Sequence, residues 1–325
     1  MKRAILALLA CAAIAFAQKT ILAPGMSQDM IREIERDVPG VKIIPSRDQI
    51  ATADAVIGGI NPGDFAKAKN LKWVHISSAG VEKGLFPALI QSDVVVTNAK
   101  NVYGPQIADH AFAFLLALTR KLNVTIPNQK LEEWPRGREG MFELNGKTAV
   151  IIGVGGIGSN IAQRAHGFGM KVIGVDPRDV PPGNFLSKVV PPDRLDTVLP
   201  EADVVFISAP HTKKSEGMMG AKQFELMKKG SYFIAVSRGK IYSHDGLVKA
   251  LDSRRLAGAG LDVTDPEPLP KGDPLWKFDN VVITPHTAGG SDNLAMRIDT
   301  LVKENIRRFA AGLPLLNVVN KEEGY

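Results

Sequence analysis

The chain has 325 residues, of which 45% are hydrophobic and 23% are charged, a balance typical of a folded protein with apolar material for two domains of ordinary size. This composition excludes a disordered chain, a collagen-like chain and a multi-span membrane protein. The formal net charge is +6, but the basic residues are scattered and are not interleaved with aromatics, so nucleic-acid binding is not expected.

Residues 1–17 have the features of a secretory signal peptide. Lys2 and Arg3 form a short positive region, an apolar run too short to span a bilayer follows, and Ala15-Phe16-Ala17 fits the small-residue cleavage rule. We therefore expect export to the periplasm or the medium, with no membrane association beyond it. A lipoprotein box ending at Cys11, the one cysteine of the chain, is the weaker alternative. A mis-assigned start codon would instead leave the protein in the cytoplasm.

After residue 18, short β-rich runs alternate with helical patterns, which is typical of βαβ units and a parallel sheet. A small α/β layer is expected first, followed by a long helix at 105–120 that is apolar all round and therefore buried. A second alternating series begins at residue 148, and the final helix, at 293–311, is expected to return to the first layer. The expected strands are 20–23, 41–45, 55–58, 72–76, 94–97, 148–154, 171–176, 202–209, 231–236, 257–263 and 280–285.

A glycine-rich turn joins the strand at 148–154 to the helix after it. Gly153-Val154-Gly155-Gly156-Ile157-Gly158 has the spacing G-x-G-x-x-G, and the next strand ends in Asp176, 18 residues beyond Gly158. In this context Gly153 permits a tight turn, Gly155 lets a pyrophosphate approach the helix N-terminus, and Gly158 allows close packing. Asp176 can accept hydrogen bonds from ribose hydroxyls and repel a 2′-phosphate. NAD is therefore favoured over NADP, although Arg178 could serve such a phosphate.

Arg238, Glu267 and His286 each follow one of the last three expected strands. Because ligands of an open parallel sheet bind beyond the carboxyl ends of its strands, we expect these residues beside the dinucleotide site. An arginine can hold a carboxylate, a histidine can exchange a proton with a hydroxyl, and a carboxylate can orient that histidine. With NAD carrying the hydride, the set suits oxidation of a hydroxyl next to a carboxylate.

Short motifs occur along almost the whole chain in the order of a known family. They are Ser78-Ala79-Gly80-Val81, Ile107-Ala108-Asp109-His110, the glycine turn with Asp176, Ser237-Arg238-Gly239, Gly260-Leu261-Asp262-Val263 with Glu267-Pro268, Pro285-His286-Thr287-Ala288-Gly289, and Gly312-Leu313-Pro314. With these motifs the chain resembles the D-isomer-specific 2-hydroxyacid dehydrogenases. The chain departs from the usual pattern at His211 and at Tyr242-Ser243-His244, and the second departure leaves the capping of the following helix undetermined.

The resemblance implies a role for each matching residue. Arg238 is the expected substrate clamp, Glu267 the partner of the histidine, and His286 the proton donor and acceptor. Main-chain amides around Ala79-Gly80-Val81 are expected to meet the substrate carboxylate. Asp262 is expected near the nicotinamide amide, and the other implied cofactor contacts are Ala209, Pro210, Ser215 and Val236.

The expected fold is a Rossmann-type NAD domain, residues 101–290, inserted in a smaller flavodoxin-like α/β substrate domain, residues 18–100 and 291–325. The expected function is NAD-dependent interconversion of a small D-2-hydroxy acid and its 2-oxo acid by a homodimer. The alternatives are a non-catalytic NAD(H)-responsive binding protein on the same scaffold and a related dehydrogenase acting on formate or phosphite. No metal site is expected, because the histidines are scattered along the chain.

Overall fold

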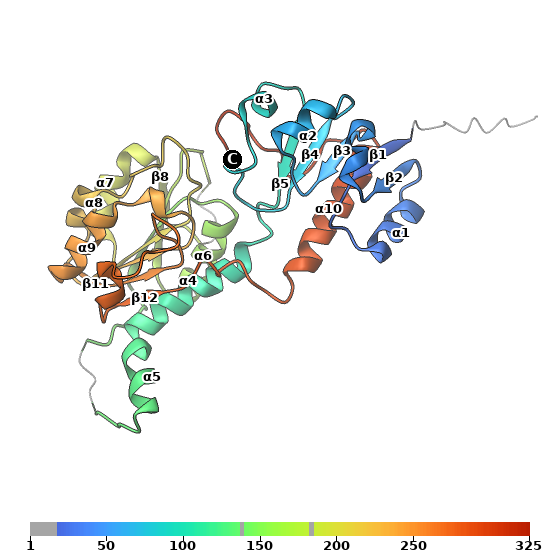
Figure 1. Cartoon of the computed structure of the whole chain (residues 1–325). Coiled ribbons are helices and arrows are strands. Elements are labelled where there is room, and N and C mark those ends of the chain that lie inside the picture. Colours follow the sequence, from blue (N-terminus) through green and yellow to red (C-terminus); the bar gives the residue numbers. More distant parts are fainter. Residues whose placement is uncertain (1–17, 137–139, 182–184) are drawn as a thin grey trace, which may run out of the picture. The chain divides into compact units, whose positions relative to one another are not determined.

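The computed structural model describes residues 18–136, 140–181 and 185–325; the predicted signal peptide at 1–17 lies outside them. The chain divides into two compact α/β units, and most of their elements are labelled in Figure 1. Unit 1 consists of the chain up to Ile76 with Phe86–Thr97 and Leu301–Val318, and unit 2 consists of Ser77–Leu85, Asn98–Thr300 and Val319–Tyr325. Among the residues described, no helix has the length and apolar character needed to cross a membrane.

Unit 1 is built on a five-stranded sheet of order β2-β1-β3-β4-β5, the flavodoxin-like order. β1 pairs in parallel with β2 and β3, and β3 pairs in parallel with β4. The Ser27 hydroxyl caps α1 by accepting a hydrogen bond from the Met30 amide. The elements are β1 (Lys19–Leu22), α1 (Gln28–Asp37), β2 (Val41–Ile44), a 3₁₀ turn (Arg47–Thr52), β3 (Ala55–Ile57), α2 (Pro62–Lys67), β4 (Trp73–Ile76), α3 (Pro87–Ile90), β5 (Val95–Asn98) and most of α10 (Leu294–Ala310).

A buried polar group lies inside unit 1. Trp73 Nε1 donates a hydrogen bond to Thr97 Oγ1 at 2.8 Å, and the same hydroxyl lies 2.9 Å from His75 Nδ1. Burial lowers the pKa of His75 to about 4. Its Nε2 has no hydrogen-bond partner among the residues described. The imidazole is therefore neutral at pH 7 and shares the Thr97 hydroxyl with Trp73.

Unit 2 contains a fully parallel seven-stranded sheet of order β12-β11-β10-β9-β6-β7-β8. This is the dinucleotide-binding order of a Rossmann fold, extended by β12. The elements are α4 (Gly104–Thr119), α5 (Leu122–Lys130), β6 (Thr148–Ile152), α6 (Gly156–Gly167), β7 (Lys171–Val175), β8 (Lys188–Val190), α7 (Leu195–Val198) between 3₁₀ turns (Pro192–Arg194 and Leu199–Glu201), β9 (Val204–Ile207), α8 (Ala221–Leu226), β10 (Ser231–Ala235), a 3₁₀ turn (Gly239–Ile241), α9 (His244–Asp252), β11 (Leu256–Leu261), a 3₁₀ turn (Pro274–Lys277) and β12 (Val281–Ile283).

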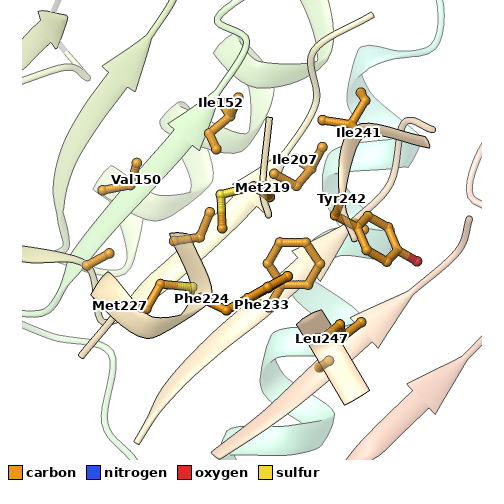
Figure 2. Close-up of a cluster of buried hydrophobic side chains, with 14 of the residues drawn as sticks. Val150, Ile152, Ile207, Met219, Phe224, Met227, Phe233, Ile241, Tyr242 and Leu247 are labelled. Carbon is orange, nitrogen blue, oxygen red and sulfur yellow. The ribbon is translucent and has the colours of Figure 1, made fainter. Parts of the chain in front are cut away.

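Two apolar clusters cover the two faces of this sheet, because alternate residues of each strand point to opposite sides. Figure 2 shows the cluster in which Val150 and Phe233 pack with Phe224 of α8. On the other face α4 packs against α6 and β11. Gly260 makes that approach possible, since a Cβ at this position would lie 2.5 Å from the Cβ of Phe114. The run at 105–120 is therefore largely buried, as expected, but Asp109, Ala113 and Arg120 are exposed, so the helix is not buried all round.

Two elements were not expected from the sequence. Helix α5 contains Pro127 and has no buried residue, so it lacks the apolar periodicity that marks a helix in a sequence. Strand β8 is three half-buried residues long. The departure at Tyr242-Ser243-His244 leaves the capping of α9 intact, because the Ser243 hydroxyl accepts a hydrogen bond from the Gly246 amide at 3.1 Å.

The compact units also differ from the expected domain boundaries. Residues 77–85, 98–100, 291–300 and 319–325 were assigned to the substrate domain but cluster with unit 2. Side-chain contacts explain two of these differences. Arg297, near the start of α10, donates hydrogen bonds to Val102 O and Gln106 Oε1, and the loop at 77–85 is bound to unit 2 through Arg238, as described next.

Candidate functional site

The glycine turn lies between the end of β6 and the start of α6. Gly153 has a φ of 90°, and a Cβ there would lie 2.5 Å from the Cα of Ala209, so the turn requires glycine. A Cβ on Gly155 would meet nothing closer than the Arg178 guanidinium at 4.0 Å. The N-terminus of the 12-residue helix α6 therefore opens onto free space, the arrangement that binds a phosphate.

Asp176 follows β7 and is 4% exposed. One carboxylate oxygen accepts from the Val154 amide at 2.8 Å, and Arg178 binds both oxygens through Nε at 2.8 Å and Nη2 at 3.0 Å. Burial opposes ionisation, but the hydrogen bonds from Arg178 and the two amides outweigh it and lower the pKa of Asp176. Asp176 is thus an ionised carboxylate whose charge Arg178 largely compensates.

Arg238 follows β10 and is held on two sides. Its Nε donates to Glu82 Oε1 at 2.6 Å, and its Nη1 donates to the Ser237 carbonyl at 2.7 Å. The guanidinium lies against Gly80, where a Cβ would collide with Nη2. The loop at 77–85 is further fixed by Tyr103, whose hydroxyl donates to Ser77 O, and by Asn98, whose amide donates to Ala79 O.

His286 and Glu267 form a direct pair. Nδ1 of His286 lies 2.6 Å from Glu267 Oε1, and the two side chains are 43% and 40% exposed. A carboxylate at Nδ1 places the proton of that nitrogen between the two groups, which leaves Nε2 available for proton exchange with a ligand. His286 has a φ of 54°, so its backbone is held in the left-handed region by its surroundings.

Asp262 supplies that constraint. Its carboxylate accepts hydrogen bonds from the amides of Thr287 at 2.8 Å and Ala288 at 3.0 Å, and from the Thr284 hydroxyl. His110 contacts the same hydroxyl at 2.9 Å. The Asp262 carboxylate therefore fixes the loop that carries His286, and Asp262 also lines the cavity described below, so its expected place near the nicotinamide amide stays a prediction. Nothing in the sequence indicated this arrangement, because His110 stood out only as part of a motif and Thr284 only as a residue of an expected strand.

A cavity of about 610 Å³ within unit 2 brings most of these residues together. Ser215 also contributes to the shape of its wall, because its hydroxyl donates to Pro210 O and accepts from the Thr212 amide. Val81, Gly158 and Glu267 do not line the cavity, and Glu267 reaches it only through His286. The predicted residues that line it are Ala79, Gly80, Gly153, Gly155, Gly156, Ile157, Asp176, Ala209, Pro210, Ser215, Val236, Arg238, Asp262 and His286.

The cavity fits a dinucleotide. It runs from the open N-terminus of α6 and the Asp176 carboxylate to the loop that carries His286. The Ser237 hydroxyl on its wall is buried and has no hydrogen-bond partner in the described part of the chain, so a polar ligand would satisfy it. Glu82 and the segment Glu323–Tyr325 also line the cavity, and sequence reasoning missed both because neither lies in a motif.

Known proteins are similar to this chain in sequence and in fold. The sequence profile of the D-isomer specific 2-hydroxyacid dehydrogenase, NAD binding domain, matches residues 112–288. The chain is 34% identical over 302 residues to D-3-phosphoglycerate dehydrogenase of Archaeoglobus fulgidus, covering 91% of this chain and 54% of that protein. It is 32% identical over 292 residues to glyoxylate reductase of Korarchaeum cryptofilum, covering 87% of each.

A solved structure of a D-isomer specific 2-hydroxyacid dehydrogenase from Xanthobacter autotrophicus Py2, in complex with NADPH and MES, is 25% identical. It matches 95% of this chain and 100% of that chain with a TM-score of 0.78. The present chain thus spans about half the length of the phosphoglycerate dehydrogenase but nearly all of the glyoxylate reductase. The chain belongs to the D-isomer specific 2-hydroxyacid dehydrogenase family.

Proposed function

We propose that the protein is a nicotinamide-dinucleotide-dependent dehydrogenase that interconverts a small D-2-hydroxy acid and the corresponding 2-oxo acid. The observation that carries this proposal is that His286, paired with Glu267, lines the same cavity as Arg238 and the glycine turn. A proton donor, a carboxylate clamp and a dinucleotide cradle are the groups that the reaction needs.

Each group has a defined task in this proposal. A bound nicotinamide dinucleotide supplies the two-electron redox chemistry. In the direction of reduction, Nε2 of His286 donates a proton to the oxygen on C2 of the substrate, and in oxidation it takes that proton back. Glu267 orients the ring through Nδ1 and stabilises its protonated form. Arg238 binds the substrate carboxylate together with the main-chain amides around Gly80.

The geometry supports a preference for NAD over NADP. The main-chain amides of Gly155, Gly156 and Ile157 would hold the phosphates, and the ribose would lie near Asp176. Because both Nε and Nη2 of Arg178 already bind Asp176, little of its charge is left for a 2′-phosphate. We expect kcat/KM to be higher with NADH than with NADPH. Asp176→Ala frees Arg178 and should therefore lower the ratio of kcat/KM with NADH to kcat/KM with NADPH. An unchanged ratio would contradict this argument.

The activity is tested by following NADH oxidation with glyoxylate, hydroxypyruvate, pyruvate and larger 2-oxo acids. His286→Gln should abolish turnover while NADH binding is retained, because His286 serves proton transfer. Loss of both would point to a structural role for His286. NADH binding without turnover of any oxo acid would favour a non-catalytic binding protein, and oxidation of formate or phosphite with NAD would favour that related class of dehydrogenase.

We further propose that the protein is a homodimer in which a second copy covers the apolar surface of α5 and the residues after it. Unpartnered apolar side chains concentrated on one segment are typical of an interface. Trp134→Arg should shift the mass measured by light scattering from dimer to monomer, with Trp276→Arg, at another exposed tryptophan, as the control. The exposed residues are Leu122, Val124, Ile126, Leu131 and Trp134, the last at 88%.

Export directed by residues 1–17 is also a proposal, and it rests on the sequence alone. Cleavage after Ala17 would leave Gln18 as the first residue of the mature protein. Mass spectrometry of the N-terminus after cell fractionation tests this directly. Recovery of the uncleaved chain from the cytoplasm would contradict export and would also explain how the protein obtains coenzyme.

A further inference from the structure

Glu82 binds Arg238, but the proposed reaction gives Glu82 no task. Glu82 Oε1 accepts from Arg238 Nε at 2.6 Å. Its other carboxylate oxygen, Oε2, would lie 2.6 Å from a Cβ on Gly80, so the carboxylate folds back over its own loop. The Glu82 carboxylate is therefore bound by the Arg238 guanidinium and also lies close to the main chain of residues 79–82.

This is the place that the proposed function gives to the carboxylate of the substrate. Burial opposes ionisation of Glu82, but the hydrogen bonds from Arg238 and from its own amide, with the charges of Arg238 and His211, keep its pKa below the ordinary value. Glu82 is thus a carboxylate anion beside the cavity. It lines the cavity wall together with Gly80 and Arg238.

We propose that Glu82 occupies the position that binds the substrate carboxylate, holds Arg238 on the loop at 77–85, and must be displaced by the carboxylate of the incoming 2-oxo or 2-hydroxy acid. Glu82 is a positioning residue in this view, because it acts on substrate binding through Arg238. The inference rests on the proposed function for the identity of the displacing ligand.

Displacement is sterically and electrostatically reasonable. The Glu82 side chain is 32% exposed and that of Arg238 31%, so the glutamate can turn outward into water without stranding a buried charge. Two carboxylates cannot share one guanidinium edge without mutual repulsion. Nη1 of Arg238 remains bound to the Ser237 carbonyl, which keeps the guanidinium in place while Glu82 leaves.

Glu82→Gln separates the charge from the shape of this residue. Glutamine keeps a carbonyl oxygen that can accept from Arg238 Nε but competes less well with a carboxylate, because hydrogen bonds between charged partners are the stronger kind. We expect the Kd of oxamate for the NADH-loaded protein, and the KM for glyoxylate, to fall about tenfold, which corresponds to about 1.4 kcal/mol. The kcat should change less than twofold, since Glu82 has left before the chemical step.

The matched control is Glu216→Gln. Glu216 Oε2 lies 3.4 Å from His211 Nε2, so the variant removes the same charge near the cavity without touching Arg238. It should leave the Kd for oxamate and the KM for glyoxylate unchanged. A fall of equal size in both variants would mean that a general field effect, and not displacement, governs binding. Glu82→Ala gives the same readout should Glu82→Gln fail to fold.

The outcomes distinguish this inference from the proposed function. Weaker oxamate binding or a raised KM in Glu82→Gln would show that Glu82 holds Arg238 in its working position throughout, and would overturn displacement. Wild-type protein that turns over no oxo acid would defeat the proposed function. Oxamate binding to the NADH-loaded variants would still decide whether Glu82 competes with a carboxylate at Arg238.

Discussion

Acid should destabilise unit 1 through one buried histidine. His75 is fully buried, and burial lowers its pKa to about 4 from an ordinary value of 6.5. The unfolded chain therefore binds more protons than the folded chain between these two pH values, so stability is complete above pH 6.5 and falls as the pH drops to 4. At about 1.4 kcal/mol per pH unit, His75 alone accounts for about 3 kcal/mol of that loss.

Trp73 provides the assay, because it shares the Thr97 hydroxyl with His75. In a background where Trp134 and Trp276 are replaced by phenylalanine, tryptophan fluorescence during urea unfolding follows unit 1 alone. The free energy of unfolding is measured at pH 7 and pH 4.5 in this background and in the same background with His75→Asn. The loss of unfolding free energy between pH 7 and pH 4.5 should be smaller in the variant by about 2–3 kcal/mol. An equal loss with and without His75 would refute the conclusion that the buried imidazole is neutral.

Three further substitutions, one of them with a matched control variant, test the site, the core and a helix cap. Glu267→Gln should lower kcat by on the order of 10²-fold with NADH affinity retained, since it removes the charge that orients and stabilises the proton donor; steady-state kinetics and a fluorescence titration measure the two effects. Gly260→Ala should destabilise unit 2 by about 1–3 kcal/mol through its clash with Phe114. The control is Gly167→Ala, where a Cβ meets nothing within 4 Å, and it should not be destabilising. An equal loss of unfolding free energy in the Gly260→Ala and Gly167→Ala variants would contradict the packing argument. Ser243→Ala should cost about 1 kcal/mol in urea unfolding by removing the cap of α9, and no loss would mean that solvent caps the helix equally well.

The alternation of elements was predictable because their signals are local. A strand such as β6 is a continuous apolar run, and helix α1 begins at a serine cap. Helix α5 gave no such signal, since none of its residues is buried in the chain itself. The boundaries of the units were less predictable, because they depend on contacts such as that of Arg297 with Gln106, 191 positions apart in the sequence.

In the site too, residues placed by strand order were predictable, whereas residues placed by contacts distant in the sequence were not. The expectation that Arg238 and His286 meet beside the glycine turn followed from parallel strands ending at one edge of a sheet, and the structure places both on one cavity wall. Glu82 could not be foreseen, because its partner lies 156 positions away and a glutamate in a loop is ordinarily solvated. Likewise, no spacing rule shows that Arg178 folds back on Asp176.

The loop at 77–85 leaves unit 1 after β4, joins unit 2, and returns to unit 1 before α3. A recombinant fragment covering residues 98–300 would carry the whole seven-stranded sheet and the glycine turn but would lack Gly80 and Glu82. Such a fragment should still retain coenzyme on an affinity column, while the guanidinium of Arg238 would face bulk solvent. Exchanging only this nine-residue loop between relatives should therefore transfer their selectivity among 2-oxo acids without any change to either sheet.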